Sequence, residues 1–291
     1  MPFSRMRKAV VAGQFYPEDR NELKKMIDGF FSDLQVSSVV DKPIRAGIVP
    51  HAGYVFSGKC AAYLYRMIKN QSFDTFIILG TNHSGMGENV CFSISDFETP
   101  LGNVETDMNL VEDLLVQIKK LSVKSGVSEE AHKYEHSIEV QLPFLQQSAK
   151  NFKIVPILLK DLSIKDVEAL GRIFSSVIKQ QEKAGKKIFV LASSDFTHYG
   201  KSYRFVPFAT NIKENLYKLD NEAIDSILKL DVESFYGKSR LTTICGGNSI
   251  SLCLQIAKNL GLTAEKLCYS TSGDVLGKWD NVVGYASVGF Y

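Results

Sequence analysis

The sequence predicts an α/β fold: a single domain over residues 1–291 with a mainly parallel central sheet flanked by helices. Short apolar runs rich in β-branched residues alternate with longer segments of helical periodicity, which is typical of this class. The apolar residues of 73–79 are continuous rather than alternating, as in a strand covered on both faces. No internal repeat or linker-like stretch suggests a second domain.

We expect the following elements from this pattern. Strands are predicted at residues 46–49, 73–79, 90–94, 152–158, 188–192, 266–271 and 281–291. Helices are predicted at residues 18–34, 57–69, 106–121, from 137 onward, 164–183, 212–230, 232–236 and 250–260. Residues 95–104 and 123–134 are expected to be irregular, and the last third is expected to add antiparallel strands at an edge of the sheet.

The composition is that of an ordinary globular protein, with 45% hydrophobic and 23% charged residues. A net charge of +2 gives no argument for a nucleic-acid partner. We expect no membrane association, because no apolar run is long enough to span a bilayer and the first residues do not resemble a signal peptide. The five cysteines are odd in number and lack C-x-x-C spacing, which argues against disulfides and for the reducing cytoplasm.

The stretch KIFVLASSDFTHYG, residues 187–200, is the one around which the chain is organised. It begins as a buried strand and then presents Asp195 and His198 just past the strand end. Chemistry collects at that edge in open α/β sheets. The two side chains could form an acid/base pair, or Asp195 could fix the imidazole tautomer of His198. Helix capping by Asp195 with an exposed His198 is the alternative interpretation.

Three other turns follow apolar runs and also carry reactive side chains. His51 follows residues 45–50, His83 follows 75–80, and Cys245 follows 241–244. If these runs lie in one sheet, all of these side chains can meet at one rim. Each one alone is equally typical of a structural role: a histidine of a glycine-flanked turn, or a cysteine buried as a small hydrophobe. Recurrence at strand ends favours function.

Two imidazoles and an anionic ligand commonly hold a redox metal with open coordination positions. Cys245 suits the anionic role because Gly246 and Gly247 allow a tight turn, and a helix start beside the sulfur favours the thiolate. The stretch HKYEH, residues 132–136, matches the inverted zinc-protease pattern, but helical periodicity begins only at Ser137. A zinc hydrolase is therefore a remote alternative. His136 is kept as a possible pocket residue, since it lies at the start of that helix.

Taken together, these segments resemble the Memo proteins. The matching motifs occur in the family's order over nearly the whole chain: AGQFYP (12–17), VPHAGYVFSG (49–58), LGTNHSG (79–85), EHSIEVQLPFL (135–145), SSDFTHYG (193–200) and TICGGNSI (243–250).

The resemblance implies a fold similar to class III extradiol dioxygenases, which are non-haem iron enzymes, and a cytoplasmic protein. It also implies an association with a radical-SAM protein. His51, His83 and Cys245 would be the metal ligands, with Asp195 lining the same pocket and His198 at the place of the dioxygenases' catalytic base. The dioxygenases use a carboxylate where this chain has Cys245, so ring cleavage of a catechol does not follow from the fold.

Two hypotheses follow. The first is a metal-dependent oxidoreductase that holds Fe(II), or alternatively copper, and takes dioxygen or a small reducing substrate. The second is a non-catalytic adaptor that uses the same pocket for an anionic group, because animal Memo proteins resemble adaptors that recognise a phosphorylated peptide.

Overall fold

A sheet of twelve strands runs through the computed structural model, which describes residues 6–34, 43–69 and 71–291. Its centre is a run of five parallel strands, which confirms the predicted fold class. In spatial order these are β6 (Gly102–Thr106), β8 (Lys153–Leu159), β3 (Thr75–Thr81), β9 (Ile188–Ser193) and β2 (Ala46–Val49).

The last third of the chain adds antiparallel strands beside β2, as the sequence predicts. Strand β12 (Asn281–Phe290) pairs with β2, with β11 (Ala264–Thr271) and with β10 (His198–Gly200). Towards the opposite edge lie four short strands: β1 (Met6–Arg7), β4 (Val90–Phe92), β5 (Asp96–Thr99) and β7 (Ser125–Val127).

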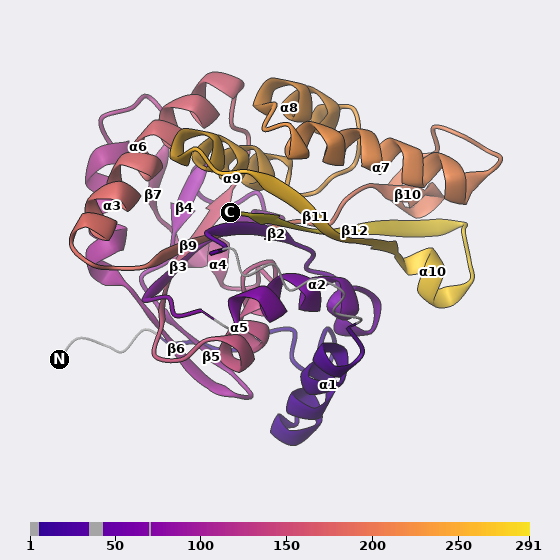
Figure 1. The fold of residues 1–291 in the computed structure, drawn as a ribbon, viewed down its shortest axis with the longest axis horizontal. Coiled ribbons are helices and arrows are strands. Elements are labelled where there is room, and N and C mark those ends of the chain that lie inside the picture. Colours follow the sequence, from indigo (N-terminus) through magenta and orange to yellow (C-terminus); the bar gives the residue numbers. More distant parts are fainter. Residues whose placement is uncertain (1–5, 35–42, 70) are drawn as a thin grey trace.

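Helices cover both faces of the sheet (Figure 1). One layer contains α1 (Arg20–Ser32), α2 (Tyr54–Ile68) and α5 (Leu142–Ser148). The other contains α3 (Met108–Ile118), α6 (Ile164–Lys183) and α9 (Gly247–Leu260), extended by α7 (Ile212–Leu228) and α8 (Val232–Arg240). The short helical segments are α4 (Glu129–His132), α10 (Ser272–Leu276) and the 3-10 turns at Glu139–Gln141 and Lys201–Tyr203.

The central strands read as continuous apolar runs because each supplies two separate cores. Ile77 and Leu79 of β3 belong to the core beneath α3, α6 and α9, whereas Phe76 and Ile78 belong to the core beneath α1, α2 and α5. Successive side chains of a strand point to opposite faces of the sheet, so a strand covered on both faces needs an apolar residue at every position.

Two stretches that we expected to be irregular contain regular structure, so those predictions are wrong. Residues 95–104 supply β5 and the start of β6, which pair as a hairpin around Pro100. Residues 123–134 supply β7 and α4. These elements are short and polar, and they are held by side-chain bonds such as that from the Thr106 backbone N–H to Asp96 Oδ1, at 2.8 Å. Periodicity over so few residues gives little signal.

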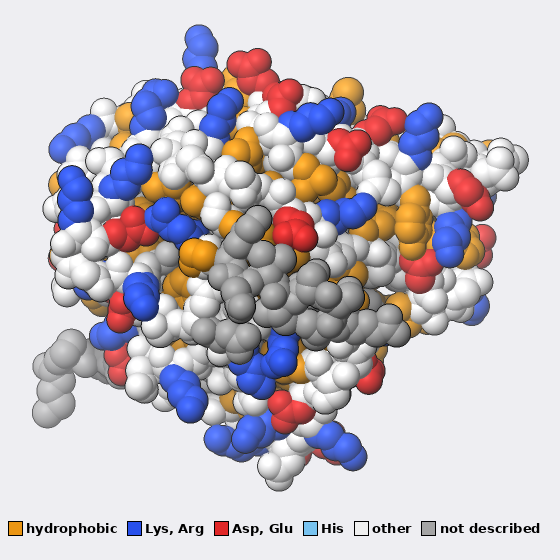
Figure 2. Space-filling model, viewed as in Figure 1, with side chains coloured by type: hydrophobic (Ala, Val, Ile, Leu, Met, Phe, Trp, Pro, Cys, Tyr) orange, Lys and Arg blue, Asp and Glu red, His pale blue; other side chains and the backbone are white. Residues whose placement is uncertain are grey.

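Basic and acidic side chains are interspersed over the face in Figure 2. Among the residues that the structure describes, no helix combines the length and apolar character needed to cross a bilayer.

Candidate metal centre

The sheet brings the predicted turns together at one edge. Strands β3, β9 and β2 are parallel neighbours, so their carboxyl ends coincide, with Val49 opposite Ser193 and Leu79 opposite Ala192. His51, His83 and Asp195 each lie two residues beyond one of these strands. Their convergence follows directly from the pairing of the strands.

Cys245 reaches the same edge by a different route from the one expected. Residues 241–244 form the connection between α8 and α9 and are not a strand, so the predicted apolar run does not belong to the sheet. The turn depends on Gly246, because an added Cβ there would lie 2.4 Å from Cβ of Ser194. Its backbone N–H donates to Ser194 Oγ at 2.9 Å, which holds Cys245 against the end of β9.

Three imidazoles and a thiol gather at this edge. The ligating nitrogens of His51, His83 and His136 lie within 4.8 Å of one another and could hold a metal ion. The rings of His83 and His136 stack with their centroids 4.7 Å apart. Cys245 Sγ lies 3.2 Å from His51 Nε2 and accepts the backbone N–H of Asp195 at 3.3 Å. His136, predicted only as a possible pocket residue, is therefore among the histidines of the cluster.

Hydrogen bonds fix the tautomer of His51. Ser193 Oγ donates its single proton to the carbonyl of Ser137 at 2.6 Å and accepts from Gln141 Nε2 at 2.8 Å. The 3.0 Å contact between Ser193 Oγ and His51 Nδ1 must then have the imidazole as donor. Nε2 of His51 keeps its lone pair and faces Cys245, which is the state required of a metal ligand.

Glu135 orients His83 in the same way. Its Oε1 lies 2.9 Å from His83 Nδ1, and the carboxylate also accepts the backbone N–H groups of His83, His136 and Ser137. Because the carboxylate accepts the Nδ1–H bond, the proton stays on Nδ1 and Nε2 is the nitrogen that would face a metal. Nothing in the sequence pattern pointed to this role of Glu135, although the residue lies inside the HKYEH stretch.

The electrostatics of the cluster combine two neutral imidazoles with one that is charged. Burial lowers the pKa of His51 well below 6.5, and burial lowers that of His136 to about 4. Burial would raise the pKa of Glu135, but the hydrogen bond from His83 and the charges of His83 and His136 lower it to about 2. Burial would lower the pKa of His83, but its hydrogen bonds to Cys245 and Glu135 raise it to about 10. In the metal-free protein a protonated His83 therefore lies beside the Glu135 carboxylate.

Asp195 and His198 lie at this edge but do not hold each other as expected. Asp195 Oδ1 accepts the backbone N–H groups of His51 at 2.8 Å and Ala52 at 3.2 Å, and burial raises the pKa of this carboxyl. Nδ1 of His198 faces two carbonyls, those of Phe196 at 3.0 Å and Thr243 at 3.1 Å. Carbonyls only accept, so Nδ1 carries the proton and Nε2 is the basic nitrogen.

His132 is a structural residue, in contrast to His136. Its side chain is buried at the end of α4, where Nε2 lies 3.0 Å from the carbonyl of Cys91. The inverted zinc-protease pattern requires both histidines on one helix, but His136 lies beyond the end of α4. The geometry thus gives no support to the zinc-hydrolase alternative.

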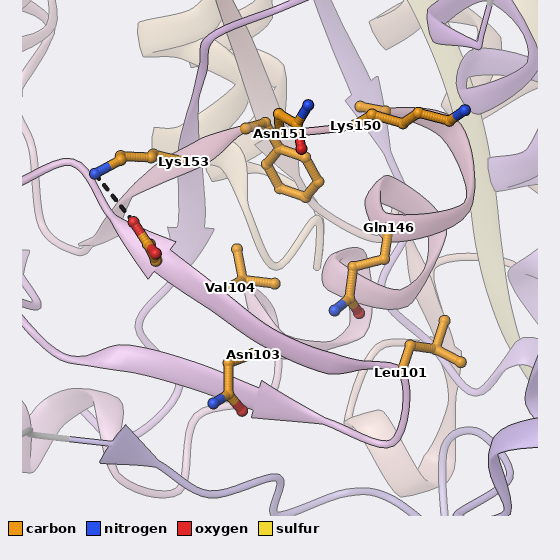
Figure 3. Close-up of a pocket in the computed structure, with 10 residues that line it drawn as sticks. Leu101, Asn103, Val104, Gln146, Lys150, Asn151 and Lys153 are labelled. Atoms are coloured by element: carbon orange, nitrogen blue, oxygen red, sulfur yellow. Dashed lines mark ion pairs between the residues drawn. The ribbon is translucent and has the colours of Figure 1, made fainter.

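A hollow of about 650 Å³ lies near the amino-terminal end of β8, away from the carboxyl ends of the strands, and none of these residues lines it. Figure 3 shows it between the β5–β6 hairpin, with Leu101 and Val104, and the segment from Gln146 to Lys153. Lys153 begins β8, whereas the histidines follow the carboxyl ends of the strands parallel to it. The ion pair drawn there, between Lys153 and Glu105 at 3.0 Å, is exposed.

Comparison with known proteins agrees with the arrangement of the motifs. The model of the family described as "Memo-like protein" matches residues 7–289. The chain belongs to the Memo family. A MEMO1 family protein of Pyrococcus furiosus is 41% identical over 97% of this chain and 98% of its own length.

Two further relatives have similar coverage. MEMO1 family proteins of Methanosarcina barkeri and Nitrosopumilus maritimus are 40% and 37% identical, covering 97% and 98% of this Memo chain and 99% of their own lengths.

The buried His132 makes the stability of the metal-free protein depend on pH. Burial lowers its pKa from 6.5 to about 4, so between these values the unfolded chain binds a proton that the folded chain does not. We therefore expect the free energy of unfolding to fall as the pH drops from 6.5 towards 4, with a contribution from His132 of up to about 1.4 kcal/mol per pH unit.

Urea unfolding of the parent and of His132→Asn, in chelator at a series of pH values, checks this expectation. The substitution should make the slope in this window shallower, whatever its effect on absolute stability. Asp220, whose pKa burial raises to about 6, contributes a slope of opposite sign, but it does so in both proteins. Parallel stability curves would contradict the assignment.

Proposed function

We propose that this Memo-family chain is a metal-dependent oxidoreductase of the cytoplasm that acts on a small molecule. His51, His83 and Cys245 are the proposed ligands, and Fe(II) is the proposed metal, with copper as the alternative. The observation that carries the proposal is the convergence of three imidazoles whose nitrogens lie within 4.8 Å of one another. Ser193 and Glu135 bind Nδ1 of His51 and of His83, so Nε2 is the nitrogen that each would offer to a metal. A thiol lies 3.2 Å from one of these nitrogens.

The donor set fits a transition metal. Two imidazoles with one anionic donor are typical of non-haem iron, and a thiolate also suits copper. Such a metal, when bound, supplies a one-electron redox centre with open positions for dioxygen or a reducing substrate. His136 is a fourth candidate donor, because its nitrogen lies within 4.8 Å of those of His51 and His83.

The charges of the site support a cation over an anionic ligand. The Glu135 carboxylate lies 2.9 Å from His83 Nδ1, and Asp195 and Cys245 flank His51. A phosphate group placed among these residues would meet two carboxylates and a thiol at close range, and we therefore rank the phosphopeptide adaptor below the metal site.

His198 is the proposed base. Two carbonyls hold its Nδ1 proton, so Nε2 can accept a proton from a substrate. The ring of Tyr203 contacts His198 edge-on with centroids 5.0 Å apart, and Phe15 contacts His136 at 4.9 Å. These aromatic rings offer apolar surface beside the polar donors, which suits a substrate with an aromatic or other apolar part.

Metal affinity should follow the ligands and the group that orients them. We expect His51→Ala and His83→Ala to abolish stoichiometric Fe(II) binding, and Glu135→Gln to weaken it about 10–100-fold, because the amide no longer holds the Nδ1 proton as a carboxylate does. Anaerobic titration with metal analysis measures both effects.

His132→Asn is the matched control, since it removes a buried histidine outside the cluster and should leave Fe(II) binding unchanged. If the parent protein bound no transition metal, or if His51→Ala bound as well as the parent, the proposed site would be wrong.

Replacement of the base should separate turnover from metal binding. We expect His198→Gln to retain Fe(II) and to reduce turnover of a reducing substrate under air by about 10²–10⁴-fold, the usual contribution of a positioned base. Oxygen consumption with a panel of catechols and thiols, beside metal analysis of the same samples, is the measurement. Metal-independent binding of phosphotyrosine peptides that His198→Gln blocks would instead favour the adaptor.

A further inference from the structure

Two cysteines outside the metal centre lie together between a helix and the edge of the sheet. Cys60 is a buried residue of α2, and Cys268 is a half-buried residue of β11. Both contribute to a small cluster with Val283 and Tyr285 of β12.

Ser287 of β12 holds this arrangement. It pairs with Cys268 across the antiparallel ladder, so both side chains lie on the same face of the sheet. Its Oγ donates to the carbonyl of Cys60 at 2.6 Å and lies 3.8 Å from Cys60 Sγ. One hydroxyl therefore fixes the helix cysteine beside the strand cysteine.

The two thiols have different environments. Cys268 packs against the cluster that contains Cys60, and this neighbour lowers the pKa of Cys268 against the effect of burial, helped by the charges of Lys59 and Lys266. Burial raises the pKa of Cys60, which stays a thiol. By contrast, burial raises the pKa of Cys253 to about 12. A half-buried cysteine with a lowered pKa beside a buried cysteine with a raised pKa is the arrangement of an attacking and a resolving cysteine.

We propose that Cys60 and Cys268 are a redox-active dithiol that closes a disulfide between α2 and β11 on reaction with a hydroperoxide. The inference does not depend on the metal centre, because none of its residues is a proposed ligand.

The chemistry proceeds in two steps. The Cys268 thiolate attacks the terminal oxygen of the hydroperoxide: an S–O bond forms, the O–O bond breaks, and two electrons pass from sulfur to the leaving alkoxide, which takes a proton to become an alcohol. Cys60 sulfur then attacks Cys268 sulfur: an S–S bond forms, the S–O bond breaks, and the hydroxide takes the Cys60 proton and leaves as water. One hydroperoxide thus converts the dithiol into one disulfide, one alcohol and one water.

The test uses the full-length chain carrying Cys245→Ser, so that the thiol of the metal centre does not react. The reduced protein is treated with one equivalent of hydrogen peroxide, its remaining thiols are blocked under denaturing conditions, and intact mass and peptide maps are recorded. We expect the loss of two hydrogens and one cross-linked peptide pair containing Cys60 and Cys268.

Three variants in this background sharpen the result. Cys268→Ser should slow peroxide consumption about tenfold, because the reactive thiolate is gone. Cys60→Ser should stop the reaction at a sulfenic acid on Cys268 that dimedone traps. Cys253→Ser, which alters another buried thiol, should leave the cross-link unchanged.

Several outcomes would overturn the proposal. These are a Cys268 that stays a free thiol in the treated protein, a disulfide that joins other cysteines, or oxidation of Cys268 to sulfinic acid while Cys60 stays free. If Cys60→Ser fails to fold, Cys268→Ser still tests the proposal, because Cys268 is only half-buried and its replacement disturbs the core less.

Discussion

Two hydrogen bonds to imidazole Nδ1 atoms determine what the site can bind. The hydroxyl of Ser193 has no second proton to offer, and the carboxylate of Glu135 only accepts, so Nδ1 of both His51 and His83 carries a proton and Nε2 is the nitrogen that each would offer to a metal. In the metal-free protein the pKa of His83 is raised to about 10, so a metal would have to displace the second proton of this ring. Ser193 and Glu135 are therefore the groups that would orient the two histidines of the proposed metal centre.

One polar segment supplies most of the bonds that hold the site in place. This segment is residues 135–141. In it, Glu135 orients His83, and the carbonyl of Ser137 accepts the hydrogen bond from Ser193 Oγ. Gln141 donates to Ser193 Oγ and to the carbonyl of Pro50. Glu139 is fully buried and binds Arg7 at 2.6 Å and the hydroxyl of Tyr16 at 2.6 Å, which ties the N-terminal strand to the same segment. Buried polar networks of this kind are rigid when every member is satisfied.

The sequence predicts the sheet and the convergence at its edge well, for a physical reason. Strands buried on both faces are unmistakably apolar, and parallel neighbours must end at the same edge, so His51, His83 and Asp195 could be placed together in advance. Cys245 could not be placed in this way, because it lies in the turn before helix α9 and not after a strand. The packing of Gly246 against Ser194 brings it to the site. The roles of Glu135 and Ser193 could not be predicted, because their hydrogen bonds join residues far apart in the chain and leave no periodic signal in the sequence. We expected a hydrogen bond between Asp195 and His198. Instead, Asp195 accepts hydrogen bonds from backbone N–H groups, and Nδ1 of His198 faces two backbone carbonyls.

The most direct test of this account is a crystal grown with Fe(II) under nitrogen, with anomalous scattering recorded at the iron edge. The account predicts one iron peak within bonding distance of Nε2 of His51 and of His83, with Cys245 Sγ as a further ligand. An iron peak bonded to neither histidine, or no peak in a crystal that contains iron, would contradict it.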